Sequence, residues 1–217
     1  MIDQYINRII QGDCLEVMKG MSDKCVDLIV TDPPYGIKMS KGYKGFEGFR
    51  GFGKPIKRKS YQDNWDYKRP CPEIFYNILR VGKSVIIFGG NYFADILPQS
   101  THWIVWDKLQ TMPTFSDCEL LWTNINRKSV KKITVEWNGL LGKENIRLHP
   151  TQKPVKLIEK IIDTYSKQGD IIFDPFSGSG TTAVAAKELN RKFICVEIDP
   201  KYCKIAEDRL KQEVLGI

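Results

Sequence analysis

The sequence contains 217 residues, of which 42% are hydrophobic and 27% are charged, and this composition is typical of a globular protein. No apolar run approaches the roughly 20 residues of a transmembrane helix. The first residues also lack the charged and then apolar pattern of a signal peptide. These features exclude a bundle of membrane-spanning helices. We expect a single domain over residues 1–217, located in the cytoplasm.

The positive charge is concentrated in one segment. The net charge is +7, and residues 38–69 contain ten basic and three acidic side chains, which leaves 23 of each sign elsewhere. Glycines recur in this segment at every third position between aromatic residues, a pattern that fits neither helix nor strand. We expect a loop whose cations and rings contact nucleic acid. The predicted contacts are Lys41, Lys44, Arg50, Lys54, Lys57, Arg58 and Lys59.

The alternative for this segment is a solvated loop whose aromatic residues close over the site. A second, smaller basic cluster consists of Arg127, Lys128, Lys131 and Lys132. It could extend a nucleic-acid surface, and a solvated turn explains it equally well.

The cysteines and histidines form neither a disulfide pattern nor a metal-binding pattern. The six cysteines contain no C-x-x-C pair, and several lie in apolar surroundings, so we expect buried free thiols. With only His102 and His149 in the chain, we expect no histidine-based metal site.

One predicted strand ends in a stretch suited to chemistry. Residues 26–31 are apolar and β-branched, as in a buried strand of a parallel sheet. Pro33 and Pro34 cannot continue the strand because each lacks a backbone N–H. Asp32 and Tyr35 are therefore placed at the carboxyl end of a strand, where open α/β sheets bind ligands. A plain turn with Asp as turn former is the alternative.

The remaining elements alternate between strands and helices. Short apolar runs predict further strands at 6–11, 84–88, 103–106, 119–123, 133–137, 171–174 and 193–198. Apolar residues at helical spacing predict helices at residues 14–19 and 71–79 and from Pro154 to Gly169. An Ala-rich helix is predicted after Thr182 and extends to Leu189, and a last helix begins at Pro200. This alternation predicts an α/β fold with a parallel, doubly wound sheet.

A second predicted site follows the strand at 171–174. Gly178 and Gly180 open a helix, and Glu197 stands 19 residues after Gly178, which matches the outline of a nucleotide-binding turn. A dinucleotide is the obvious ligand, but the Asp174 carboxylate beside the turn would repel a pyrophosphate. The same carboxylate would attract the amino group of a cationic, phosphate-free ligand, a description that S-adenosylmethionine meets. The chain has no Gly-Lys-Ser/Thr sequence, so a P-loop is excluded.

Three sequence blocks stand in a defined order along nearly the whole chain. They are Thr31-Asp-Pro-Pro-Tyr-Gly, His149-Pro-Thr-Gln-Lys-Pro and Phe173-Asp-Pro-Phe-Ser-Gly-Ser-Gly-Thr-Thr. In this order they resemble the β class of amino (N6-adenine/N4-cytosine) DNA methyltransferases. The resemblance implies a circularly permuted class I fold with a Rossmann-like, mostly parallel, seven-stranded sheet. It also implies S-adenosylmethionine as cofactor and DNA as partner.

The resemblance further implies which residues contact the cofactor. The Asp174 turn would shape the methionine end of the pocket, and Glu197 would bind the ribose. Asp13 and Cys14 would bind the adenine edge, and Lys153 the cofactor carboxylate. The full set of expected cofactor contacts is Asp13, Cys14, Asp32, Lys153, Asp174, Phe176, Ser177, Gly178, Gly180, Thr181 and Glu197.

The implied catalytic residues are Asp32, Pro33, Pro34 and Tyr35. The exocyclic amine of adenine is a poor nucleophile because its lone pair is delocalised into the ring. Asp32 and the Pro33 carbonyl would accept its hydrogens, and Tyr35 would stack on the base. We expect positioning by Asp32 to matter more than its strength as a base. The base must leave the duplex, at a cost of about a few kcal/mol.

The methyl acceptor is less sharply defined than the cofactor. Asp rather than Ser before Pro-Pro-Tyr favours the N6 amine of adenine over the N4 amine of cytosine. Attack on carbon 5 of cytosine needs a cysteine nucleophile, and Cys71 precedes a predicted helix instead of ending a strand. Three further hypotheses are methylation of RNA, methylation of a protein glutamine amide, and a nucleic-acid-binding module without catalytic activity. The basic segment disfavours a protein substrate.

The sequence also suggests how the target and partners are engaged. Residues 38–69 are the expected DNA-contacting loop, and residues 109–147 are a candidate recognition insert. We expect a monomer or homodimer, and a cognate restriction enzyme is a candidate partner.

Overall fold

The computed structural model describes residues 2–37, 68–110, 116–137 and 152–212. The chain divides into two compact units, Met1–Pro33 together with Cys71–Ile217, and Pro34–Pro70. The predicted nucleic-acid contacts between Lys41 and Lys59 lie outside the described residues, as do most of the expected DNA-contacting loop and residues 111–115 and 138–147 of the candidate recognition insert.

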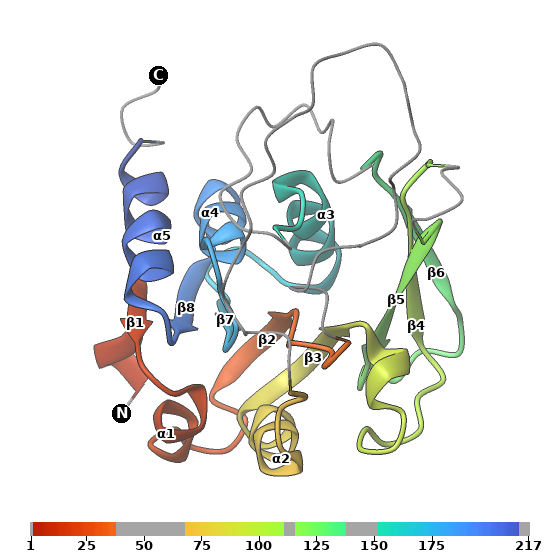
Figure 1. Cartoon of the computed structure of the whole chain (residues 1–217), viewed down its shortest axis with the longest axis horizontal. Helices are drawn as coiled ribbons and strands as arrows, with labels where there is room; N and C mark the ends of the chain where they lie inside the picture. Colours follow the sequence, from red (N-terminus) through yellow and green to blue (C-terminus); the bar gives the residue numbers. More distant parts are fainter. Residues whose placement is uncertain (1, 38–67, 111–115, 138–151, 213–217) are drawn as a thin grey trace, which may run out of the picture. The chain divides into compact units, whose positions relative to one another are not determined.

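The first unit is built on an eight-stranded sheet (Figure 1) with the strand order β1-β8-β7-β2-β3-β5-β4-β6. Its strands are β1 (Arg8–Gln11), β2 (Val26–Thr31), β3 (Gly82–Phe88), β4 (Trp103–Asp107), β5 (Cys118–Thr123), β6 (Lys131–Thr134), β7 (Ile171–Asp174) and β8 (Lys192–Glu197). Neighbouring strands are parallel except where β5 pairs with β3 and β4. The prediction of a mostly parallel sheet is confirmed.

The strand count differs from the seven that the resemblance implied. The additional strand, β6, pairs in parallel with β4 through Val105–Lys132 and Trp106–Ile133. It begins at Lys131, before the predicted start of this strand, and ends at Thr134. By covering β4, this short strand satisfies backbone groups that would otherwise form an open sheet edge.

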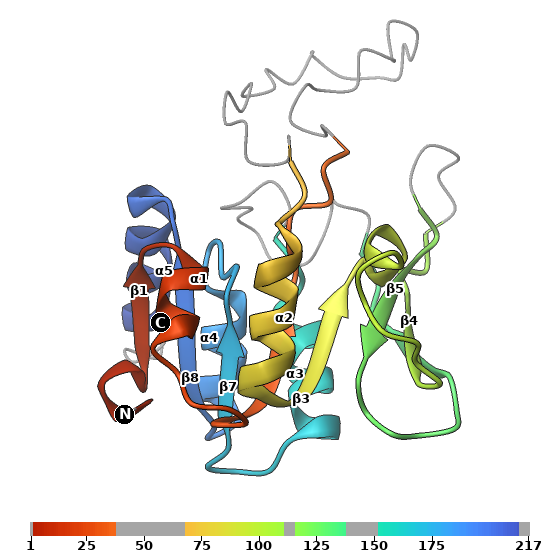
Figure 2. The ribbon, with the colours of Figure 1, turned by 90° about the horizontal axis from the view of Figure 1, so that it is seen from below.

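Helices cover both faces of the sheet (Figures 1 and 2). On one face lie α3 (Val155–Tyr165), α4 (Thr181–Glu188) and α5 (Pro200–Gln212), and on the other α1 (Cys14–Lys19) and α2 (Pro72–Val81). Two short 3-10 helices, η1 (Ile2–Tyr5) and η3 (Gly90–Phe93), complete the described elements. Within the described ranges, no helix is both long and apolar enough to cross a bilayer.

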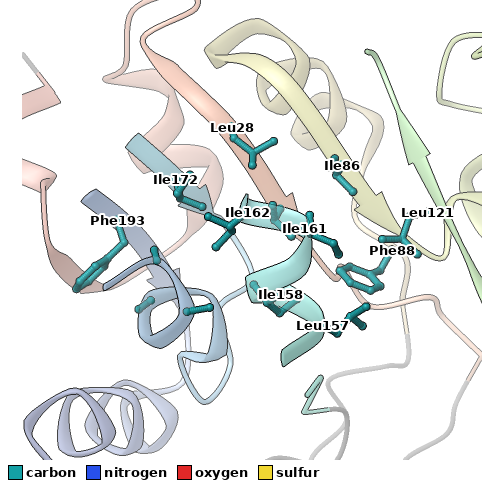
Figure 3. Packing of buried hydrophobic residues seen from close by; sticks show 14 of the residues in the cluster. Leu28, Ile86, Phe88, Leu121, Leu157, Ile158, Ile161, Ile162, Ile172 and Phe193 are labelled. Carbon is teal, nitrogen blue, oxygen red and sulfur yellow. The ribbon is translucent and has the colours of Figure 1, made fainter. Parts of the chain in front are cut away.

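The core forms where α3 packs on the centre of the sheet (Figure 3). The stripe predicted for this helix is buried, and its members are Leu157, Ile158, Ile161 and Ile162. They belong to one cluster with Leu28, Ile86 and Ile172 from three adjacent strands. All six cysteines are free; Cys14, Cys195 and Cys203 are buried as expected, whereas Cys71 and Cys118 are exposed.

The strand directions place the predicted sites at one edge. Because β1, β8, β7 and β2 are adjacent and parallel, their carboxyl ends meet at the same edge of the sheet. The four acidic residues Asp13, Asp32, Asp174 and Glu197 stand at or just after these ends. This edge is the one where open α/β sheets bind ligands.

Candidate active site

The ends of β2 and β7 are joined by a buried hydrogen bond. Thr31, the last residue of β2, donates its hydroxyl to Oδ1 of Asp174, the last residue of β7, over 2.8 Å. Asp32 follows Thr31 directly, so the predicted catalytic carboxylate lies beside the predicted cofactor turn. The sequence placed both at strand ends, and the structure brings them together.

Asp174 is held by three donors. Besides Thr31, the Thr182 hydroxyl donates to Oδ2 over 2.6 Å, and the Phe176 backbone N–H donates to Oδ1 over 3.0 Å. The residue is 5% exposed, and this burial raises the pKa of its carboxyl group to about 6 despite the three hydrogen bonds. A nearby positive charge would therefore favour the ionised form of Asp174.

The turn after β7 requires its glycines. Gly178 and Gly180 have φ of +51° and +79°, where side chains are disfavoured. A Cβ at Gly180 would stand 2.6 Å from Cβ of Ala206 on α5, so glycine also permits close packing there. Arg209 of α5 donates to the Ser179 carbonyl over 2.8 Å. Both contacts fix the turn against α5.

Glu197 closes the turn from the neighbouring strand. Its Oε2 accepts from the Gly178 N–H over 2.8 Å, and its Oε1 accepts from the Asp199 N–H over 2.9 Å. Burial raises the pKa of this carboxyl group. Asp13 stands one strand further along and caps α1 by accepting from the Leu15 N–H over 2.8 Å.

Comparison with known proteins identifies the family. A family model described as DNA methylase matches residues 102–208. The type II methyltransferase M.HinfI of Haemophilus influenzae is 30% identical, with the match covering 97% of this chain and 70% of M.HinfI. The chain belongs to the N6/N4 DNA methyltransferase family. M2.DpnII of Streptococcus pneumoniae, also a type II methyltransferase, is 29% identical over 98% of this chain and 94% of its own length.

Solved structures confirm the class I fold of this methyltransferase. The M1.HpyAVI–SAM complex matches with a TM-score of 0.60 and 25% identity, over 94% of this chain and 98% of that one. The cytosine-N4-specific PvuII DNA methyltransferase matches with a TM-score of 0.61 at 17% identity, over 94% and 88% of the two chains. The cofactor of this methyltransferase is S-adenosylmethionine.

The turn after β7 offers groups that suit this cofactor. The Ser177 hydroxyl is buried and lacks a hydrogen-bond partner among the described residues, so it is available to a polar ligand group. Gly178 has no side chain to cover the backbone of the turn. Each carboxylate oxygen of Glu197 can accept a second hydrogen bond, which suits ribose hydroxyls. Ile198, which follows Glu197, is 71% exposed and offers an apolar surface that no sequence pattern predicted.

The remaining expected contacts lie around this turn. Phe176 is half-buried, whereas Thr181 at the start of α4 is buried. Cys14 is buried at the start of α1, and burial raises the pKa of its thiol to about 12. Cys14 is therefore a neutral, apolar neighbour of Asp13 and not a nucleophile.

Lys153 has partners that differ from the one implied by the resemblance. Its ammonium donates to Oδ2 of Asp32 over 2.5 Å and lies 3.5 Å from Oε2 of Glu119. Gln152, its neighbour, accepts from the Ser179 hydroxyl over 3.3 Å. The segment before α3 thus contacts both Asp32, at the end of β2, and Ser179, in the turn after β7. A contact of Lys153 with the cofactor carboxylate stays a prediction.

The residues after Asp32 divide between the two units. Pro33 belongs to the first unit, and Pro34 and Tyr35 open the second. In that second unit Gly36 has a φ of +75°, and a Cβ there would stand 2.9 Å from Cγ of Arg69. The two ends of the unit therefore pack closely together.

Glu119 and Lys108 are two site residues that no sequence pattern predicted. Lys108 pairs with Glu119 over 2.8 Å, and both side chains are largely buried. Glu119 lies near the amino end of β5, which is antiparallel to β3. The carboxyl-end rule applies to parallel strands only, so it could not point to this residue.

Proposed function

We propose that this methyltransferase transfers the methyl group of S-adenosylmethionine to the N6 amine of adenine in DNA. The observation that carries the proposal is the position of Asp32 beside the cofactor turn, through the Thr31–Asp174 hydrogen bond. Methylation of an amine needs a hydrogen-bond acceptor for that amine next to the site of the methyl donor.

Asp32 and Pro33 make the substrate amine a better nucleophile. The Asp32 carboxylate and the Pro33 carbonyl accept hydrogen bonds from its two N–H groups, which favours a pyramidal nitrogen with an available lone pair. After the methyl group is transferred, the nitrogen gives up one of these protons to water. When bound, S-adenosylmethionine supplies an electrophilic methyl group on a sulfonium. Tyr35 gives the extruded base an aromatic face to stack on. Holding the nitrogen in line with the methyl group is the main contribution of these residues.

The cofactor residues divide by chemistry. Ser177, Gly178 and Gly180 receive the amino-acid end of the cofactor, and the Asp174 carboxylate favours its positive charge. Glu197 binds the ribose hydroxyls. Asp13 and Cys14 line the adenine edge, joined by the exposed Ile198. Phe176 and Thr181 complete the pocket walls.

DNA binding is assigned to the basic segment. The excess charge of the chain lies within residues 38–69, and cations there bind phosphates while the base is extruded. Residues 109–147 are the proposed recognition insert. A cognate restriction enzyme is a candidate partner, since M.HinfI and M2.DpnII are type II methyltransferases.

Cytosine N4 is the second candidate target. The similarity of the fold to the cytosine-N4-specific PvuII enzyme supports it. The N6 amine of adenine and the N4 amine of cytosine also need the same kind of hydrogen-bond acceptors. Asp at position 32, in place of Ser, favours adenine. RNA is a weaker candidate.

The test is direct. The protein is incubated with S-adenosylmethionine labelled on its methyl group and with unmethylated duplex DNA or a structured RNA. The products are digested to nucleosides and separated. Label in N6-methyladenine from DNA supports the proposal, whereas label in N4-methylcytosine or only in RNA overturns it. Sequencing of the modified DNA then locates the recognition site.

A further inference from the structure

Four charged side chains form a continuous row that begins at the proposed catalytic carboxylate. The Lys153 ammonium lies 2.5 Å from Oδ2 of Asp32 and 3.5 Å from Oε2 of Glu119. The Lys108 ammonium lies 2.8 Å from Oε1 of Glu119. The signs alternate along the row, so its net charge is zero. The four residues come from the end of β2, the segment before α3, β5 and the end of β4.

Both lysines of the row lie close to aromatic rings and are largely buried. The Lys153 ammonium lies 5.1 Å from the centroid of the Phe88 ring, and the Lys108 ammonium lies 5.1 Å from that of Trp106. The side chains of Lys153 and Lys108 are only 12% and 13% exposed. Ion pairs this shielded rarely stabilise a fold more than apolar residues of the same volume would. Stability alone is therefore a poor explanation for the row.

Glu119 is the member of the row whose backbone is held by the sheet. It stands in β5, where its backbone pairs with Trp106 of β4, so its position depends on the sheet and not on a loop. Lys153, in contrast, has a long flexible side chain and stands in an irregular segment before α3. A carboxylate anchored in the sheet can hold the Lys153 ammonium at one place.

We propose that Glu119, itself held by Lys108, positions Lys153 so that Lys153 orients the Asp32 carboxylate towards the substrate amine. Glu119 and Lys108 are positioning residues, since they act through Lys153. The inference rests on the proposed role of Asp32. It adds a connection from the interior of the sheet to the catalytic strand end.

The charges in the row depend on one another. Burial lowers the pKa of Lys153, but the carboxylates of Asp32 and Glu119 outweigh it, and the pKa lies above its usual value. Burial alone would raise the pKa of Glu119, but the ammonium groups of Lys153 and Lys108 outweigh this effect, and the pKa lies below its usual value. The next acid along the edge is Asp174, which interacts with Asp32.

The expected consequence of removing Glu119 follows from these partners. In Glu119→Gln, Lys153 loses one of the two carboxylates that favour its protonated form. Its pKa falls, so the alkaline decline in rate, which lies above the measured range in the wild type, moves towards that range. The methyl-transfer rate at neutral pH also falls, by roughly tenfold or more, because Asp32 is less well oriented.

The test measures the single-turnover rate of methyl transfer between pH 6 and 10, with cofactor affinity and thermal unfolding as parallel readouts. Glu119→Gln is compared with Lys153→Met and with the double variant. Lys108→Met probes the far end of the row, and Lys108→Arg should restore the rate. Lys83→Met is the matched control, because it removes the Lys83–Asp27 ion pair near the start of β3 without touching the row.

The outcomes separate this inference from the proposed function. If Glu119 acts through Lys153, the double variant is no slower than Lys153→Met, and its cofactor affinity equals that of Lys153→Met. Independent, multiplicative losses in the double variant would overturn the inference, as would a wild-type rate in Glu119→Gln at neutral pH. If Glu119→Gln does not fold, the Lys108→Met and Lys108→Arg pair decides by the same criteria. Failure of wild-type protein to methylate an exocyclic amine would instead refute the proposed function.

Discussion

The hydroxyl of Thr31 donates a 2.8 Å hydrogen bond to the carboxylate of Asp174, although 143 residues separate the two in the chain. This bond joins the strand that carries Asp32 to the strand that carries the proposed cofactor turn. The distance between Asp32 and that turn is thus determined by two adjacent strands of one sheet and not by a flexible loop. Such rigidity suits a reaction that depends on alignment.

Asp32→Ala should abolish methyl transfer while cofactor binding stays measurable. Loss of the acceptor should lower the single-turnover rate by at least ~10²-fold, with a change of only a few fold in the dissociation constant for S-adenosylmethionine. Asp208→Ala is the control, because it removes a half-exposed acid of α5 that pairs with Lys211. A wild-type rate in Asp32→Ala would show that the catalytic assignment is wrong.

Gly180→Ala should weaken both folding and cofactor binding. An alanine at this position would have an unfavourable φ of +79°, and its Cβ would stand 2.6 Å from Cβ of Ala206. The overlap alone should cost about 1–3 kcal/mol. Gly169→Ala is a matched control, since φ there is +85° with no atom within 4 Å of the added Cβ. It should cost only the backbone term of about 1–2 kcal/mol. Equal unfolding free energies for the two variants would contradict the packing argument.

Cofactor affinity should decrease as the pH falls through about 6. Burial raises the pKa of Asp174 to about 6, so below that pH the carboxyl group is protonated and neutral. A neutral group no longer attracts the positively charged cofactor, whereas above pH 6 the ionised form does. Calorimetric titration from pH 5 to pH 8 measures the dependence. Asp174→Asn should flatten this step, and a step unchanged in that variant would assign it to another group.

Replacing Lys57, Arg58 and Lys59 with glutamine should weaken DNA binding and reduce its salt dependence. Each lost phosphate contact should lower the slope of log K against log salt by about 0.9. The control is Lys167→Gln with Lys192→Gln. Both side chains are exposed, and Lys192 begins β8, at the opposite edge of the sheet from Asp32. If the triple variant keeps the wild-type slope, the basic segment does not contact DNA.

Local sequence was sufficient for many of the elements. The predicted bounds of α1, β2 and β7 match the observed Cys14–Lys19, Val26–Thr31 and Ile171–Asp174. Two prolines end β2, and Gly169 precedes β7, so the signals that delimit them are in the chain itself. The order of the three blocks also predicted the family, which the comparison with M.HinfI confirms.

The sequence by itself determined which strands end in carboxylates, because apolar runs and the prolines or glycines that stop them are local properties. Only the tertiary structure decided that Lys153 would pair with Asp32 and Glu119. The reason is the direction of β5, which runs antiparallel to β3. It brings its amino end to the edge where the parallel strands bring their carboxyl ends, and no local pattern encodes that meeting.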